Sequence, residues 1–200
     1  MGYKIKNLSD LDEDSTSEMS RIFIENFGHI FQNFSKDKEL LRECFERSFI
    51  YDMIYVAFDD DKVVGFIAYS SYKGRVINVS KKTFCNHFGK IKGSIFSWKL
   101  KRSMGRQIVN EANQCYVDFV AVDKSYRRKG VAIELFNYIH EHLIFDEFIL
   151  DVSNKNLEAQ NLYKKLGYIT VKINKSIITR FRGFGDLIVM KYRLTEKICL

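Results

Sequence analysis

Apolar and polar residues follow patterns that predict helices in the first quarter of the chain and strands directly after it. A short strand is expected over residues 3–7, followed by a helix that begins at a capping-box pattern over 15–18. A second helix is expected over 36–48, where apolar residues recur with helical spacing. Two apolar runs, 53–58 and 63–69, flank a short acidic turn and predict an antiparallel hairpin.

The second half of the chain alternates between strand and helix patterns. The expected order is strand 115–122, helix 130–143, strand 148–152, helix 156–166, and then strands 168–173 and 187–192. A strand–helix–strand unit normally joins parallel neighbours, with the helix packed on the sheet. The sequence therefore predicts an α/β protein in which a mixed sheet contains a parallel pair and has helices on its faces.

Residues 73–110 form an insertion that is basic and helical in pattern. Spacings of four, three, four and three residues separate Phe84, Phe88, Ile91, Ile95 and Trp98. Such a stripe packs onto the sheet, or it lies on an anionic membrane or along nucleic acid. Gly89 and Gly93 are expected to divide the segment into two shorter helices.

Composition and charge restrict the class of protein. The chain has 200 residues, of which 46% are apolar and 28% charged, and we expect one globular domain over 1–200. The four cysteines are scattered, which disfavours a disulfide framework or a zinc site, and no other metal site is expected. The first ten residues lack the apolar core of a secretory signal, so we expect a cytoplasmic protein.

The net charge of +7 is unevenly distributed. Residues 62–110 contain eleven lysines and arginines and no Asp or Glu. Such an asymmetry creates a positive field over one part of the surface, which attracts phosphates and acidic substrates. The insertion therefore favours an anionic ligand or an acidic protein surface.

The most informative segment is the basic loop after strand 115–122. Arg127, Arg128 and Lys129 precede Gly130, which opens an amphipathic helix. The first N–H groups of a helix have no partners within it, and a glycine allows a phosphate to approach the main chain. The loop contains neither a Walker motif nor a dinucleotide fingerprint, but its construction predicts pyrophosphate binding.

Two motifs in this half resemble those of a known family. Residues 127–132 read Arg-x-x-Gly-x-Ala, which resembles the R/Q-x-x-G-x-G/A signature of the GCN5-related N-acetyltransferase (GNAT) superfamily. Residues 156–163 read Asn-x-x-Ala-x-x-Leu-Tyr and are followed by Gly-Tyr at 167–168, which resembles the second motif of that family. Ala132 stands where many members have glycine, a permitted variant. The resemblance is strong over about 115–170.

The resemblance implies a GNAT-like fold with a mostly antiparallel sheet and a splayed parallel strand pair, and it implies acetyl-CoA as co-substrate. The pantetheine arm would pair with the strand end at 120–122, and amides of 128–133 would hold the pyrophosphate. Asn156 would hydrogen-bond the pantetheine or phosphate region. The resemblance thereby assigns cofactor binding to Val120, Ala121, Val122, Arg127, Arg128, Lys129, Gly130, Val131, Ala132, Ile133, Asn156 and Tyr163.

The same resemblance implies an N-acetyltransferase whose Tyr163 protonates the leaving thiolate. The amine also needs a base, and Asp118, Asp151 or a water molecule are the alternatives. Both carboxylates interrupt apolar strands, where an acidic residue requires an explanation. Strict alternation along the strand would give one common face to Tyr116, Asp118, Val120 and Val122.

The function expected from these observations is acetyl transfer to a primary amine in a ternary complex. The acceptor, a small molecule or a protein amine, is not readable from the sequence. We expect a monomer or homodimer, with neither nucleic acid nor a membrane as partner. The alternative is a non-catalytic acyl-CoA-binding module that contacts an anionic surface through the basic insertion.

Overall fold

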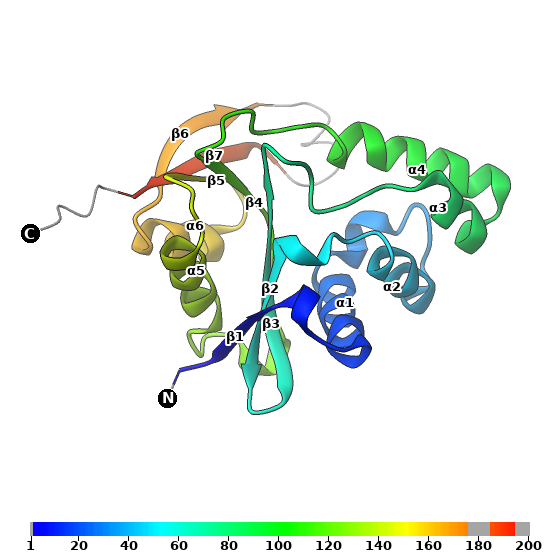
Figure 1. Ribbon diagram of the computed structural model, residues 1–200. Helices are drawn as coiled ribbons and strands as arrows, with labels where there is room; N and C mark the ends of the chain where they lie inside the picture. The colour runs from blue at the N-terminus through cyan, green and yellow to red at the C-terminus, as the bar shows by residue number, and fades with distance from the viewer. Residues whose placement is uncertain (1, 176–184, 195–200) are drawn as a thin grey trace, which may run out of the picture.

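The computed structural model describes residues 2–175 and 185–194, which form a central sheet with helices on both sides (Figure 1). The strands in these residues are β1 (Lys4–Asn7), β2 (Ile54–Asp59), β3 (Lys62–Ser71), β4 (Gln114–Val122), β5 (Glu147–Ser153), β6 (Ile169–Asn174) and β7 (Leu187–Arg193). Their α-helices are α1 (Glu13–Phe27), α2 (Lys38–Glu46), α3 (Lys81–Phe88), α4 (Lys90–Met104), α5 (Val131–His142) and α6 (Leu157–Lys165). The predicted hairpin and the alternating second half are confirmed.

The sheet has the order β1-β2-β3-β4-β5-β7-β6. All neighbouring strands run antiparallel except β4 and β5, which run parallel. α5 makes the crossover between these two strands, as a parallel pair requires. The expected mixed, mostly antiparallel sheet with one parallel pair is therefore confirmed.

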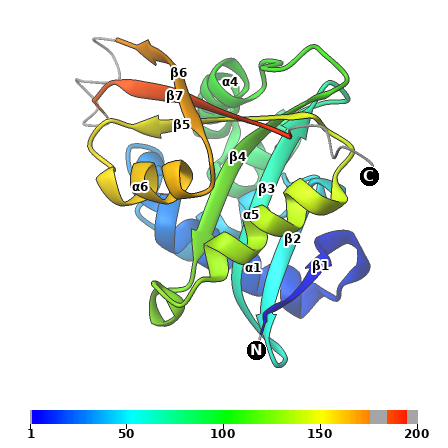
Figure 2. The ribbon, with the colours of Figure 1, turned by 90° about the vertical axis from the view of Figure 1, so that its left-hand side faces the viewer.

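Helices α1 to α4 lie on one side of the sheet, and α5 and α6 lie on the other (Figures 1 and 2). On the α1 side the core is rich in phenylalanine, with Phe23 at its centre. The ring centroid of Phe23 lies 5.2 Å from those of Phe45 on α2 and Phe119 on β4. On the α5 side, Phe136 and Phe148 are fully buried in a second core. The sheet is thus held from both sides.

The start of α1 differs from the prediction. The helix begins at Glu13, and the carboxylate of Asp12 accepts a hydrogen bond from the Ser15 N–H at 2.9 Å. The capping box predicted at 15–18 is therefore wrong, and Glu18 instead forms an ion pair with Arg21 at 3.0 Å. A carboxylate at the N-cap also complements the positive end of the helix dipole.

The basic insertion forms α3 and α4, which are separated at Gly89. Gly89 adopts a left-handed φ of 78° and ends α3, as predicted. Gly93, by contrast, lies inside α4, so the second predicted break is wrong. A Cβ on Gly93 would lie 2.5 Å from the Cα of Cys85, and its absence allows α4 to pack directly on α3.

The apolar stripe predicted for the insertion is also divided. Phe84 is buried, but Ile91, Ile95 and Trp98 are exposed on α4. Phe96 faces the core in their place. The turn at Gly89 changes the direction in which the following side chains point. Apolar residues that are regularly spaced across this turn therefore do not share one side of the two helices. None of the helices in the described residues has the length and apolar run needed to cross a bilayer.

β4 contains a bulge that sequence alternation could not reveal. Asp118 is the extra residue, because Val117 and Phe119 pair with consecutive residues of β3. Phe119 packs on the α1 side, whereas Val120 and Val122 pack on the α5 side. The single face expected for this strand is therefore wrong, and the two valines point away from Asp118.

Candidate functional site

The parallel strands β4 and β5 separate halfway along their length. They pair only over four positions, Gln114 to Val117 with Glu147 to Leu150. Beyond these, β4 stays paired with β3 as far as Val122, and β5 stays paired with β7 as far as Ser153. Figure 2 shows the two strands running apart. The main chain of β4 from Asp118 onward therefore has an edge beside which none of the described strands lies, as the predicted separation of the two strands requires.

The loop after β4 leads directly to the start of α5. Gly130 precedes the helix with a φ of 88°, and Arg128 also has a positive φ of 62°. The first bond within the helix runs from the Glu134 N–H to the Gly130 carbonyl, so the amides of residues 131–133 have no partner in it. A Cβ at Gly130 would meet no atom of the described residues within 4 Å, so the space beside this glycine is open.

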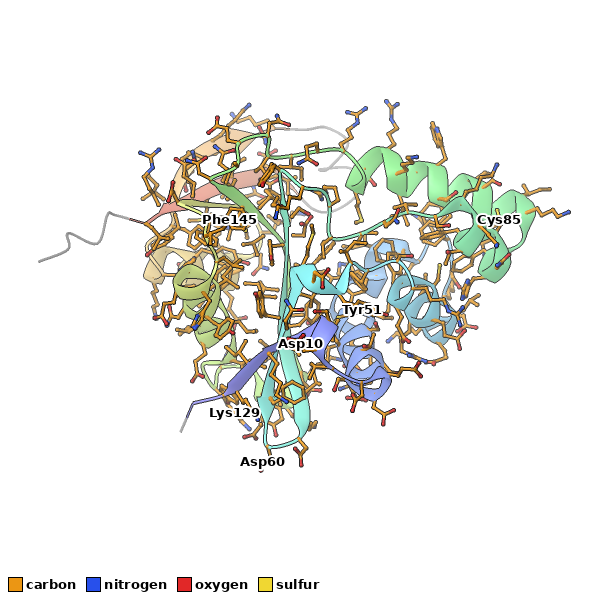
Figure 3. All side chains as sticks on the ribbon, viewed as in Figure 1. Asp10, Tyr51, Asp60, Cys85, Lys129 and Phe145 are labelled. Atoms are coloured by element: carbon orange, nitrogen blue, oxygen red, sulfur yellow. The ribbon has the colours of Figure 1, made fainter. Side chains whose placement is uncertain are left out.

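Basic side chains surround that helix start. Arg127, Arg128 and Lys129 are all exposed. Arg127 donates to the Asn26 side chain on α1 at 2.8 Å, and Lys129 lies over the Tyr126 ring, 4.6 Å from its centroid. Figure 3 labels Lys129 in this loop. The amides and charges together suit a phosphate group.

The second motif starts at Asn156, the N-cap of α6, and runs along that helix after β5. The Asn156 side-chain oxygen accepts from the Ala159 N–H at 3.1 Å and so caps α6. Its side-chain amide group remains as the donor that a ligand can use. Arg128 and Glu158 approach to 3.7 Å, so the two motifs come together although they are remote in sequence. Both groups are exposed, and this contact adds little stability.

Tyr163 lies on the face of α6 that packs against the second core. Only 8% of the residue is exposed, and its ring lies 5.5 Å from that of Phe136 in an edge-to-face arrangement. Burial raises the pKa of Tyr163 to about 12. The phenol is therefore protonated at neutral pH and able to donate a hydrogen bond.

Asp118 is held in a buried ion pair. One carboxylate oxygen lies 2.5 Å from Arg75 Nη2, and the other accepts a hydrogen bond from the Ser70 hydroxyl. The Asp118 side chain is only 3% exposed. Burial raises the pKa of Asp118 to about 6, although Arg75 and Ser70 both act to lower it. Nothing in the sequence indicated that Arg75, 43 residues before Asp118, is the partner of this carboxylate.

Asp151 occupies the corresponding part of β5 but has a different environment. It lies beyond the last residue that pairs with β4, and it is exposed. Its neighbours Leu150 and Val152 belong to the core on the α5 side, so Asp151 faces the α1 side. Desolvation raises the pKa of this carboxyl, and the neighbouring Tyr116 hydroxyl lowers it.

The described residues contain no group of His, Cys, Asp or Glu placed to hold a metal ion. Cys44, Cys85 and Cys115 are free thiols, and Cys199 lies outside the described residues. The candidate site is thus an opened strand pair, an amide-rich helix start and a buried tyrosine. These features fit a linear, phosphorylated thioester, which needs main-chain partners along its arm and donors at its phosphates.

Comparison with known proteins finds a matching family model and one similar curated protein. A family model described as the acetyltransferase (GNAT) family matches residues 16–168. N-alpha-acetyltransferase 30 of Saccharomyces cerevisiae is 32% identical over 89 residues, which cover 42% of this chain and 48% of that protein. The match thus spans about half the length of this curated relative.

Solved structures resemble the whole fold. An N-acetyltransferase from Staphylococcus aureus Mu50 superposes with a TM-score of 0.61 at 14% identity, covering 94% of this chain and all of that one. A chain in the crystal structure of the NatC complex bound to Gag peptide and CoA gives a TM-score of 0.60 at 17% identity, covering 98% of this chain and all of that one. At such identities the likeness extends to the fold alone.

Proposed function

Because the chain belongs to the acetyltransferase (GNAT) family, we propose that it transfers an acetyl group from acetyl-CoA to a primary amine within a ternary complex. The observation that carries this proposal is the separation of β4 from β5 next to an open, amide-rich helix start. Acetyl-CoA supplies a thioester whose carbonyl carbon an amine can attack. The free thiols among the described residues support a cytoplasmic location for this activity.

The residues of the first motif hold the co-substrate in this proposal. Main-chain groups of Val120 and Val122 pair with the pantetheine arm, as an added strand would, whereas those of Ala121 point toward β3 in this register. Amides and side chains of 127–133 bind the pyrophosphate, and Asn156 donates to the same region. The N–H of Val120 polarises the thioester carbonyl and stabilises the charge that develops on its oxygen. The open space at Gly130 and the unpaired edge of β4 support this assignment.

Asp151 is the base that the geometry favours over Asp118. Both oxygens of Asp118 already accept hydrogen bonds from Arg75 and Ser70, and its side chain is almost inaccessible. Asp151 is exposed where the strands have separated, so an incoming amine or a water molecule can reach its carboxylate. It takes the amine proton directly or through water.

Tyr163 is the proposed acid. Its phenol stays protonated because burial raises its pKa to about 12. The hydroxyl makes no hydrogen bond within the part of the chain that the structure describes. It is thus available to donate to the thiolate as the C–S bond breaks.

The acceptor is the least defined component. The relative that is 32% identical over 89 residues is named an N-alpha-acetyltransferase. Peptide α-amines are accordingly the first acceptors to test, followed by lysine side chains and small amines. A short acidic peptide and a short basic peptide with the same first residue would show which charge the site prefers.

The test is acetyl transfer from acetyl-CoA to this panel, together with calorimetric titration of CoA. Tyr163→Phe should bind CoA normally and lower kcat by roughly a hundredfold or more, the usual contribution of a proton donor. Asp151→Asn should remove the acidic limb of the pH profile of kcat/KM. Tyr138→Phe, on α5, is the matched control and should leave kcat unchanged.

Three results would count against these assignments. Failure to bind CoA would remove the co-substrate site altogether. CoA binding without turnover on any amine would indicate a non-catalytic acyl-CoA-binding module. An Asp151→Asn variant with an unchanged pH profile would leave Asp118 or water as the base.

A further inference from the structure

Helix α4 is apolar on two opposite sides. Its inner side buries Phe96 and Leu100 against the core. On its outer side Ile91, Ile95 and Trp98 are 81%, 49% and 62% exposed. At 100° per residue these three side chains lie within about 60° of each other and point away from the buried side. In Figure 3 the side chains on this side of α4 project away from the rest of the protein.

Basic residues flank this apolar ridge on both sides. By the same helical geometry, Lys90 and Lys101 lie along one flank, and Lys92 and Lys99 lie along the other. Arg102 lies in line with the ridge, one turn after Trp98. None of these five cations forms an ion pair within the described residues. The α4 outer face comprises Lys90, Ile91, Lys92, Ile95, Trp98, Lys99, Lys101 and Arg102.

We propose that the α4 outer face docks on an anionic lipid bilayer, with the helix lying in the plane of the membrane surface. A helix of 15 residues presents about 22 Å of length to such a surface. Its apolar ridge enters the boundary between headgroups and acyl chains, while the flanking lysines remain at the level of the lipid phosphates. This replaces the expectation that a membrane is no partner of this protein.

The arrangement fits a bilayer better than other anionic partners. A nucleic acid would meet two isoleucines and a tryptophan at the centre of the contact, where it needs charges or donors. A bilayer uses both classes of residue at once, since the apolar side chains insert and the cations attract anionic headgroups. The absence of Asp and Glu from residues 62–110 removes repulsion from the membrane.

An open hollow beside the ridge offers a place for a headgroup. It has a volume of about 490 Å³ and is lined by Lys81 on α3 and Lys101, Ile95 and Trp98 on α4. Two cations next to a tryptophan suit an anionic phosphate whose acyl chains lie along the apolar ridge.

Docking would also orient the candidate site. Arg75 Nε donates to the Met104 carbonyl at the end of α4 at 2.8 Å, and Arg75 Nη2 pairs with Asp118 at 2.5 Å. The C-terminal end of α4 is therefore fixed next to the separated strands. A bilayer under α4 would bring acceptors at the membrane surface close to that part of the sheet.

Trp98 is the single tryptophan of the chain, and its fluorescence tests the proposal directly. Vesicles of phosphatidylcholine containing phosphatidylglycerol should shift its emission to the blue, and brominated lipids should quench it. Vesicles of phosphatidylcholine alone should do neither. High salt should weaken the binding, because cations at the surface contribute to it.

Variants separate the two parts of the contact. Ile91→Ser/Ile95→Ser should abolish the blue shift, and Lys99→Glu/Lys101→Glu should weaken vesicle binding roughly tenfold or more. All four positions are exposed, so folding should be unaffected. The matched control is Ile169→Ser, at an exposed position of β6, which should bind vesicles like the wild type.

The proposal is overturned if Trp98 emission does not change with anionic vesicles, or if Ile91→Ser/Ile95→Ser binds them as well as the wild type. It is equally overturned if duplex DNA binds more tightly than the vesicles. Concentration-dependent dimerisation lost in Ile91→Ser/Ile95→Ser, without vesicle binding, would assign the face to a second copy of the chain.

Discussion

The ion pair between Arg75 and Asp118 gives the sharpest quantitative prediction. Arg75→Met retains much of the length of the side chain but leaves the Asp118 carboxylate buried without its cation. The two side chains are 10% and 3% exposed, so water cannot replace the guanidinium. Breaking one partner of such a pair costs about 3–5 kcal/mol. The variant also loses the hydrogen bond from Arg75 Nε to the Met104 carbonyl.

The free energy of unfolding that Arg75→Met loses should depend on pH in a defined direction. The folded-state pKa of Asp118, about 6, already lies above the unfolded-state value of 3.8, and Arg75 acts to lower it. Removing Arg75 raises the folded-state pKa further. A raised pKa contributes stability that is fully present below the unfolded-state value and lost as pH rises through the folded-state value. Relative to the wild type, Arg75→Met should therefore recover about 1.4 kcal/mol per pH unit as pH falls from its own raised folded-state pKa to about 6, and below 6 both proteins gain stability in parallel.

Urea unfolding at a series of pH values measures this effect. The variant should be far less stable than the wild type at pH 8, and the difference in unfolding free energy should narrow as pH falls to about 6. Arg75→Met/Asp118→Asn is the control, because it has no charge to bury and should lose the added pH dependence. A cost below about 1 kcal/mol at pH 8 would refute the reasoning, because an exposed pair contributes only that much. A cost that does not change with pH would refute it as well.

Two further predictions concern the two sides of the sheet. Gly93→Ala should lower the urea midpoint by an amount equivalent to about 1–3 kcal/mol, because a Cβ would overlap the Phe84 carbonyl. Helix propensity alone predicts that the same substitution stabilises the protein by about 1 kcal/mol. A stabilised variant would therefore contradict the packing of α3 on α4. Burial lowers the pKa of His140 from 6.5 to about 4, so protonation of this group should remove on the order of 3 kcal/mol of stability as pH falls from 6.5 toward 4, which offsets the gain from Asp118 in the wild type. His140→Gln should lose less over that range, and equal losses in thermal unfolding would show that His140 is not the group responsible.

Local patterns predicted the cofactor end of the candidate site. The loop of 127–130 and the helix that follows are contiguous, so the sequence itself places amides and cations together. Gly130 adopts the left-handed φ of 88° that its position before α5 allows a glycine to take. The separation of β4 from β5 and the positions of Asn156 and Tyr163 were implied by the family resemblance. The fold agrees with the separation, and the roles of the two residues stay predictions.

Local patterns failed where the phase of a period changed. The bulge at Asp118 adds one residue to β4, which places Val120 on the α5 side although strict alternation would give it the same side as Asp118. The turn at Gly89 likewise rotates α4 and exposes Trp98. An offset of one residue moves every later side chain of a strand to the other face of the sheet. A break between two helices likewise changes which residues of the second helix face the core. Neither offset is visible in the spacing of apolar residues.

The sequence by itself determined which elements form and where anion-binding groups follow one another along the chain, because strand–turn–helix chemistry depends on neighbours in sequence. The tertiary structure alone decided what each acidic residue meets. Asp118 receives Arg75 from a loop 43 positions away, whereas Asp151 lies exposed beyond the end of the parallel pairing. Contacts between distant segments set burial and charge, and these two quantities distinguish a structural carboxylate from one available for catalysis.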